Sequence, residues 1–126
     1  MFVQKEQLFI DFSSIAWENP ADGIRRKVMA YGDQLMAVYV EFKKGAVGAL
    51  HSHPHLQISY LQTGSFDVTI DGKTTRQKAG DFYYIPTNVV HGVVALEDSI
   101  LIDFFSPMRE DFIPKTVKST EAAGGK

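Results

Sequence analysis

The 126-residue sequence contains no cysteine, which excludes both disulfide bonds and thiolate metal sites. It has no run approaching the roughly 20 apolar residues that a membrane-spanning helix needs, so no membrane association is predicted. Neither positive nor negative charge is in large excess. The 13 basic and 15 acidic residues leave a formal net charge of −2, which argues against nucleic acid as a partner. A small anionic substrate remains compatible with this charge, because a few local basic residues are enough to bind it.

The opening residues, MFVQKEQLFIDF, lack the basic start and the apolar run of about 7–15 residues that mark a secretory signal, so we expect a cytoplasmic protein. Apolar residues make up 44% and aromatic residues 12%, enough to bury a core in a chain of one-domain length. We predict one folded domain over residues 1–113, with an N-terminal strand extension, followed by a polar, flexible tail over residues 114–126.

The chain reads as a series of short β-strands rich in Val, Ile, Phe and Tyr and separated by Gly, Pro and Asp. Asp71-Gly72 tolerates positive φ angles and predicts a tight hairpin turn. No convincing helical periodicity is present, although Met108–Phe112 can form a turn. The predicted strands cover residues 34–42, 56–62, 65–70, 73–78, 81–86, 91–96 and 99–105. This pattern predicts an all-β sandwich or barrel, and periodicity alone does not choose between them.

Three of the four histidines, His51, His53 and His55, stand within five residues, and the fourth is His91. Side chains two apart on a strand share a face, so His51 and His53 are expected to point the same way, as are His55 and Gln57 if the strand continues. Neutral imidazole is a common ligand for Zn, Ni, Fe and Cu, and the Gln57 amide oxygen can complete four ligands. We predict one divalent ion, which can be Ni, Zn, Fe or Mn.

The segment GAVGALHSHPHLQISYLQTG resembles the first of two motifs of the cupin family. Gly45, His51, His53, Gln57 and Gly64 occupy the motif positions, and they depart from it only where glutamine replaces the usual glutamate.

The segment GDFYYIPTNVVHGVVA resembles the second cupin motif, with Gly80, Pro86, Asn88 and His91 at its positions. Asn88 replaces the usual glycine, and Ala95 replaces a frequent asparagine. The resemblance covers roughly residues 35–105 and implies an all-β, single-domain cupin β-barrel, also described as a double-stranded β-helix or jelly roll. It also implies a metal inside one end, held by His51, His53, Gln57 and His91.

A narrower resemblance is to the pectin-degradation cupins. It is carried by GIRRKVMAYGDQLMAVYVEFKKGAVG, GSFDVTIDGK and IDFFSPMRED, and by glutamine at the metal position. That family is linked to ring opening of 4,5-unsaturated uronate monosaccharides, yielding a linear 5-keto-4-deoxyuronate in the breakdown of pectin or alginate. Its members carry Asp-x-Phe and then Arg on the last barrel strand. The resemblance therefore implies catalytic roles for Asp103, Phe105 and Arg109.

The neutral ligand set fits this chemistry, because three imidazoles and an amide leave the +2 charge of a divalent ion uncompensated toward an anionic oxygen. Ring opening requires that the C1 hydroxyl lose a proton, that the enol released at C5 be stabilised, and that C4 gain a proton. Asp103 is the candidate for proton transfer. Arg109 is a candidate to hold the substrate carboxylate, and Arg25 and Arg26 are others.

Other interpretations stay open at this stage. His55 is interpreted as a non-ligand, because it occupies the family's non-ligand position and follows Pro54. Asp103 and Arg109 can instead form structural ion pairs, and the IRRK run can be a solvated face. The chain can also be a non-catalytic metal- or sugar-acid-binding cupin, or a metal-dependent dioxygenase or isomerase acting on another small substrate. Gln57 weighs mildly against a dioxygenase.

Assembly can be predicted from the fold. A small barrel with an open sheet edge tends to pair with a copy of itself, so we expect a homodimer, and the apolar run LFIDF at residues 8–12 is a candidate to add a strand to the partner. The aromatic residues expected in the core are Tyr60, Phe66, Tyr83 and Tyr84.

Overall fold

The computed structural model describes residues 4–113, and the predicted tail at residues 114–126 lies outside them. The strands are β1 (Glu18–Ala21), β2 (Ile24–Gly32), β3 (Leu35–Phe42), β4 (Val47–His51), β5 (Leu56–Thr63), β6 (Ser65–Ile70), β7 (Lys73–Lys78), β8 (Phe82–Ile85), β9 (His91–Ala95) and β10 (Ser99–Ser106). Two single 3-10 turns cover Phe12–Ser14 and Glu110–Phe112. Within these described residues, no helix has the length and apolarity to cross a membrane.

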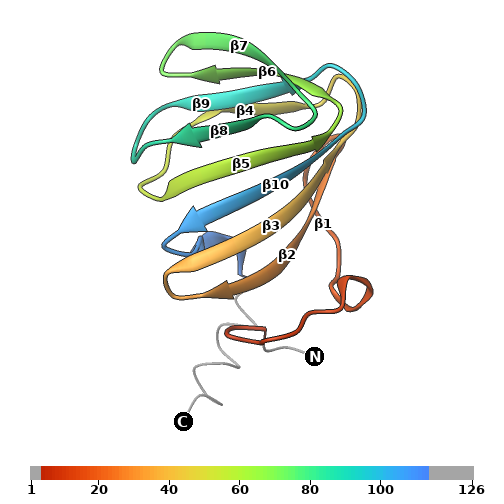
Figure 1. Ribbon diagram of the computed structural model, residues 1–126, viewed down its shortest axis with the longest axis vertical. Helices are drawn as coiled ribbons and strands as arrows, with labels where there is room; N and C mark the ends of the chain where they lie inside the picture. Colours follow the sequence, from red (N-terminus) through yellow and green to blue (C-terminus); the bar gives the residue numbers. More distant parts are fainter. Residues whose placement is uncertain (1–3, 114–126) are drawn as a thin grey trace.

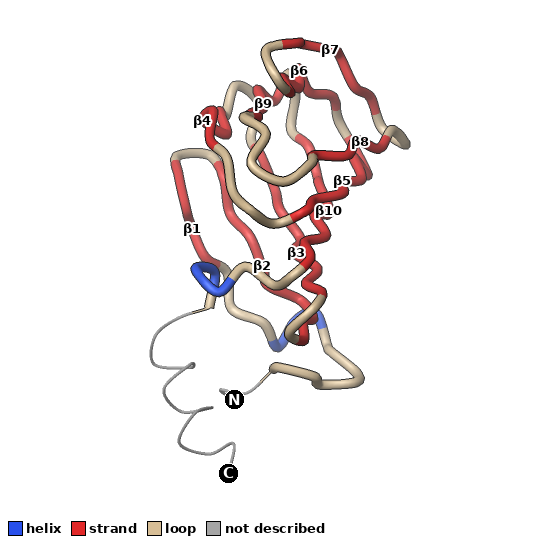
Figure 2. Tube along the Cα trace, turned by 90° about the vertical axis from the view of Figure 1, so that its left-hand side faces the viewer, coloured by secondary structure: helices blue, strands red, loops and turns tan. Residues whose placement is uncertain are grey.

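The strands form two antiparallel sheets, and the all-β prediction is confirmed. One sheet has the order β1-β2-β3-β10-β5-β8, and the other has the order β4-β9-β6-β7 (Figure 1). The view turned by 90° places β4 across the fold from β5 and β10 (Figure 2). Since β10 inserts between β3 and β5, segments far apart in the sequence lie side by side, as the resemblance to a jelly roll implies.

The core lies between the two sheets and follows the period-2 alternation of the strands. On β3 the buried side chains are every second residue, and the Phe42 ring packs edge-on against Phe66 of the other sheet at 4.8 Å. The largest fully buried side chains are Phe66, Met36, Leu61, Ile85 and Val38. Phe66 is therefore in the core as predicted, and Tyr83 packs against it. The prediction for Tyr84 is wrong: it alternates with Tyr83 on β8 and is 54% exposed.

The seven predicted strands are confirmed as β3 and β5–β10, whereas β1, β2 and β4 were not among them. Strand β2 begins with the IRRK run, which carries too much charge for an ordinary alternating pattern. Its Lys27 is buried because the N-terminal segment covers it. The Lys27 ammonium donates to the Phe12 carbonyl oxygen at 2.8 Å and lies 3.8 Å from the centre of the Phe12 ring. A basic residue on the outer face of the sheet is thus buried by a long-range contact.

The turn between β5 and β6 generates a stability prediction. Gly64 has φ +91°, and a Cβ there would collide with the Ser99 hydroxyl and lie 2.6 Å from the Ser99 Cβ. Gly72, in the β6–β7 hairpin, has φ +78° but nothing within 4 Å of its Cβ position. We expect Gly72→Ala to cost about 1 kcal/mol, which is the backbone term alone. Gly64→Ala should lower the free energy of unfolding by about 3 kcal/mol or more, because overpacking is added.

Urea denaturation of both variants checks this prediction. Equal losses of stability in the two variants would contradict this prediction. They would show that Ser99 moves aside for the added methyl group at no energetic cost.

Candidate metal centre

Three histidines meet at one end of the fold. His51 is the last residue of β4, and its register partner on β9 is His91, the first residue of that strand. His53 follows in the loop between β4 and β5, where its carbonyl oxygen accepts a hydrogen bond of 2.8 Å from the Asn88 amide. The expectation that one strand presents His51 and His53 on a shared face is therefore wrong. The strand ends at His51, and a main-chain contact with the second motif places His53.

Asn88 has φ +63°, in the left-handed region that asparagine tolerates better than most residues. This conformation explains how asparagine can stand where the motif usually has glycine. The turn at Asn88 then leads directly into β9 and positions His91.

The three imidazoles are close enough to share one ion. Their candidate ligand atoms all lie within 4.8 Å of one another. The ring centroids of His51 and His91 are 4.4 Å apart, and those of His53 and His91 are 4.8 Å apart.

Each ring is oriented by the same kind of hydrogen bond. Nδ1 of each histidine lies against a main-chain carbonyl oxygen two residues away, at 2.7 Å for His51, 3.0 Å for His53 and 2.9 Å for His91. A carbonyl oxygen can only accept, so Nδ1 carries the proton and Nε2 keeps its lone pair. This is the arrangement that metal-binding histidines use, because it fixes both the tautomer and the ring plane.

Two further observations fit a cation at this point. The Nε2 atom of His91 is buried and makes no hydrogen bond within residues 4–113. The Nε2 atom of His53 lies 3.0 Å from Oε1 of Gln57, although both atoms are acceptors once Nδ1 of His53 holds the proton. Two ligands about 2.1 Å from one ion and at right angles are about 3.0 Å apart, so the contact suits shared coordination.

The protonation state of the rings also fits a metal. Burial lowers the pKa of His91 to about 4, and a hydrogen bond to the Val89 carbonyl only partly opposes it. Burial, followed by the charge of Arg109, lowers the pKa of His53 as well. Both imidazoles are therefore neutral near pH 7, as metal ligands must be.

A buried polar network sets the direction of the Gln57 amide. Its Nε2 donates to the Ser59 hydroxyl at 2.9 Å and to Oδ1 of Asp103 at 3.4 Å, which turns Oε1 toward the histidines. Ser59 donates to the same Asp103 oxygen at 2.6 Å. Burial raises the pKa of Asp103 to about 6, and hydrogen bonds from Ser59 and Gln57, then the charges of Arg109 and Arg26, oppose the rise.

The network opens into a cavity of about 300 Å³ between the sheets. Three of the predicted ligands line it, together with the three residues predicted to be catalytic. The site residues along its wall are His51, Gln57, His91, Asp103, Phe105 and Arg109. The ring of Phe105 packs edge-on against His53 at 5.7 Å, so it buttresses the third histidine from the core side.

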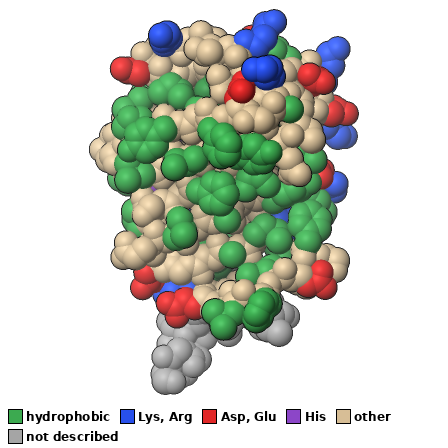
Figure 3. Space-filling model, viewed as in Figure 1, with side chains coloured by type: hydrophobic (Ala, Val, Ile, Leu, Met, Phe, Trp, Pro, Cys, Tyr) green, Lys and Arg blue, Asp and Glu red, His purple; other side chains and the backbone are tan. Residues whose placement is uncertain are grey.

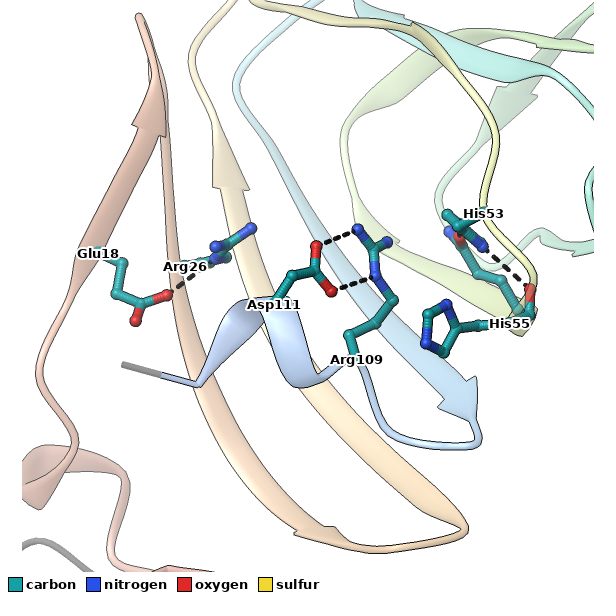
Figure 4. A network of polar contacts seen from close by, with 7 residues as sticks. Glu18, Arg26, His53, His55, Arg109 and Asp111 are labelled. Carbon is teal, nitrogen blue, oxygen red and sulfur yellow. Dashed lines mark hydrogen bonds and ion pairs between the residues drawn. The ribbon is translucent and has the colours of Figure 1, made fainter. Parts of the chain in front are cut away.

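The side chains of the two neighbouring arginines of β2 point to opposite faces of the sheet. Arg25 points outward, pairs with Glu41 at 2.7 Å and lines a wider groove of about 650 Å³ that contains none of the histidines. Arg26 points inward, pairs with Glu18 at 2.9 Å and lines the histidine cavity. Arg109 also lines that cavity and pairs with Asp111 (Figure 4).

His55 lies apart from the group of three histidines. Figure 4 shows its ring near Arg109, and its centroid is 5.6 Å from that of His53. Burial and the charge of Arg109 lower its pKa. The site residues that sequence reasoning missed are Glu18, Ser59, Tyr83 and Phe112. Of these, only Ser59 had a local signal, because it shares the face of β5 with Gln57.

Comparisons with known proteins agree with this geometry. Residues 38–104 match the model of the family described as Cupin domain. The chain is 50% identical over 107 residues to the pectin degradation protein KdgF of Dickeya dadantii (strain 3937), covering 83% of this chain and 96% of that protein.

Solved structures agree as well. A RmlC-like cupin from Shewanella frigidimarina NCIMB 400 is 40% identical with a TM-score of 0.84, over 88% of this chain and all of that one. KdgF from Halomonas sp. is 43% identical with a TM-score of 0.80, over 83% of this chain and 97% of that one. Sequence motifs, fold and site geometry thus lead to one conclusion: the chain belongs to the cupin family.

Proposed function

We propose that this chain is a metal-dependent enzyme that opens the ring of 4,5-unsaturated uronate monosaccharides of the galacturonate type, yielding the linear 5-keto-4-deoxyuronate in pectin or alginate breakdown. Its similarity to the pectin degradation protein KdgF, over almost the whole of that protein, supports this assignment. The observation that carries it is the convergence of three imidazoles, two of which line a cavity that also holds a buried carboxylate and a guanidinium.

The metal would be held by Nε2 of His51, His53 and His91 and by Oε1 of Gln57. When bound, a divalent ion supplies an electrophile that stabilises negative charge on a substrate oxygen. The ligand set of imidazoles and an amide suits Ni, Zn, Fe or Mn. Because all four proposed ligands are neutral, they would leave the full charge of the ion uncompensated toward the substrate.

Asp103 is the proposed proton-transfer group. The reaction is an isomerisation: a proton leaves O1, the C1–O5 bond breaks, and C4 gains a proton as C5 becomes a ketone. Ser59 and Gln57 both donate to Oδ1 of Asp103, and within residues 4–113 no hydrogen bond to Oδ2 is formed. Oδ2 is thus the oxygen free to accept a proton from O1 and to return one to C4.

Phe105 and Arg109 complete the proposed set. Phe105 is buried against His53 and keeps water away from that side of the site. Arg109 has a side chain only 12% exposed, held by two hydrogen bonds to Asp111, and it gives the cavity wall a fixed positive charge. An anionic sugar acid is the substrate class that such a wall favours.

The first test concerns the metal. The purified protein should contain about one divalent ion per chain, and His91→Ala should lose it, because the buried Nε2 of His91 is a proposed ligand. His55→Ala is the matched control and should keep the metal. Elemental analysis of the two variants measures this. Retention of the ion by His91→Ala, or its loss from His55→Ala, would contradict the ligand assignment.

The second test concerns proton transfer. Asp103→Asn keeps the shape of the side chain but removes the base, so kcat should fall about 10²–10⁴-fold with KM little changed. Loss of absorbance from unsaturated galacturonate, with and without a chelator, measures turnover directly. A variant that melts earlier but turns over normally per folded molecule would make Asp103 structural. Absence of turnover in the native protein would favour a non-catalytic binding cupin.

We also propose that the active form is a homodimer, joined through the outer face of the larger sheet. The outward residues of β10, β5 and β8 include no charged side chain and give a broad apolar surface (Figure 3). The most exposed apolar residues on this face are Leu35, Leu56, Ile58, Phe82, Tyr84 and Phe104.

The extent of this face favours a second copy as its partner. Side chains of this size, exposed by 37–62%, leave on the order of 500 Å² of apolar surface. That is most of the roughly 800 Å² per partner in a standard interface. Because the outward residues of β10, β5 and β8 carry no charge, they suit the same surface of a second copy better than a charged partner.

Phe82→Glu should therefore convert the dimer to a monomer, because it places a charge within the buried face. Leu8→Glu is the control, since Leu8 is 86% exposed in the N-terminal segment, where residues 4–17 contain one isolated bridge but no strand. Light scattering at micromolar concentration distinguishes the two. A monomeric Leu8→Glu beside a dimeric Phe82→Glu would instead favour exchange of the N-terminal run, and a monomeric native protein would contradict both routes.

A further inference from the structure

Two arginines reach the histidine cavity, and their side chains are held differently. Arg109 donates from Nε and Nη2 to both carboxylate oxygens of Asp111, at 3.0 and 2.7 Å. One forked edge of its guanidinium is therefore already occupied by a carboxylate of the protein (Figure 4).

Arg26 is anchored in a way that leaves its terminal nitrogens available. Only Nε is engaged, donating to Glu18 Oε1 at 2.9 Å, and within residues 4–113 the two Nη atoms make no hydrogen bond. The guanidinium carbon lies 3.8 Å from the centre of the Phe112 ring, which stiffens the side chain. The same ring lies 4.3 Å from the guanidinium carbon of Arg109. Phe112 thus holds both cations beside one cavity.

A positive charge on the inner face of a strand is costly unless it is paired or used. Glu18 is a partial explanation, but it engages the inner nitrogen and leaves the planar Nη1–Nη2 edge without a partner. That edge has the geometry that binds a carboxylate through two parallel hydrogen bonds. Arg26 lines the same cavity as Asp103, and its charge is one of those that act on the Asp103 carboxyl.

We propose that Arg26 binds the carboxylate of the uronate substrate through its Nη1–Nη2 edge, an inference that rests on the proposed function. The substrate carboxylate is attached to C5, next to the C4 atom that must receive a proton. The residue that holds this carboxylate therefore also sets the distance between C4 and Asp103. In this arrangement Arg26 is a substrate-binding residue, and Arg109 adds charge from the neighbouring wall.

Binding of a non-reacting pair of ligands tests the proposal without requiring turnover. Galacturonate carries the carboxylate, and galacturonamide replaces it with a neutral group of similar shape. Calorimetry on the metal-loaded protein should give tighter binding of galacturonate than of the amide. Arg26→Lys keeps the charge but loses the fork, so the Kd for galacturonate should rise about tenfold or more, while that for the amide changes less than about twofold.

Arg25→Lys is the matched control, because Arg25 is the neighbouring residue on the same strand and points away from the cavity. It should bind both ligands like the native protein. With unsaturated galacturonate, Arg26→Lys should raise KM about tenfold and leave kcat within about threefold.

The outcomes separate this inference from the proposed function. Normal turnover with an unchanged KM in Arg26→Lys would overturn the role of Arg26 and leave the enzyme assignment standing. Arg26-dependent binding of galacturonate without any turnover would support Arg26 and overturn the enzyme. A native protein that binds galacturonate no better than its amide would overturn the inference, as would a variant that only melts earlier while its folded fraction binds normally.

Discussion

The site depends on three hydrogen bonds that fix imidazole rings to the main chain. Because Nδ1 of His51, His53 and His91 each donates to a carbonyl oxygen two residues away, each ring is held in one orientation that leaves its Nε2 lone pair for an ion. The strands and turns around the site bring these three histidines together. β4 and β9 pair at their histidine ends, and the Asn88 amide holds the loop that carries His53. A pre-oriented set of lone pairs of this kind lowers the reorganisation needed to bind an ion.

A row of buried polar side chains crosses the larger sheet beside the histidines. Asp103, Ser59 and Tyr83 are register partners on three adjacent strands, and burial, followed by the charge of Asp103, raises the pKa of Tyr83. Such a row would weaken an ordinary core, since buried polar groups must all find partners. Here the partners are one another and the Gln57 amide, so the orientation of a proposed metal ligand is coupled to the proposed proton-transfer group.

The same strands give the sheet two unlike faces. Each residue of this polar row has a chain neighbour that points to the opposite face. These neighbours, Phe104, Ile58 and Tyr84, are also register partners, and they form part of the exposed apolar face. The alternation of side chains thus builds the cavity on one side and a surface suited to a second copy on the other. A one-residue slip of register would exchange the two faces, so packing strongly specifies the register.

Most of the strands could be predicted from the sequence, because alternation and turn residues are local properties, and the three histidines could be assigned because their motifs keep fixed spacing. Other features depended on contacts between distant residues. Lys27 is buried because Phe12 and Trp17 lie over it, and His53 is placed by the amide of Asn88 after its strand has ended. Arg25 and Arg26 are alike in sequence. Only the pairing of β2 with its neighbours decided that one meets solvent and the other lines the cavity, because the face of a strand that becomes interior is set by what packs against it.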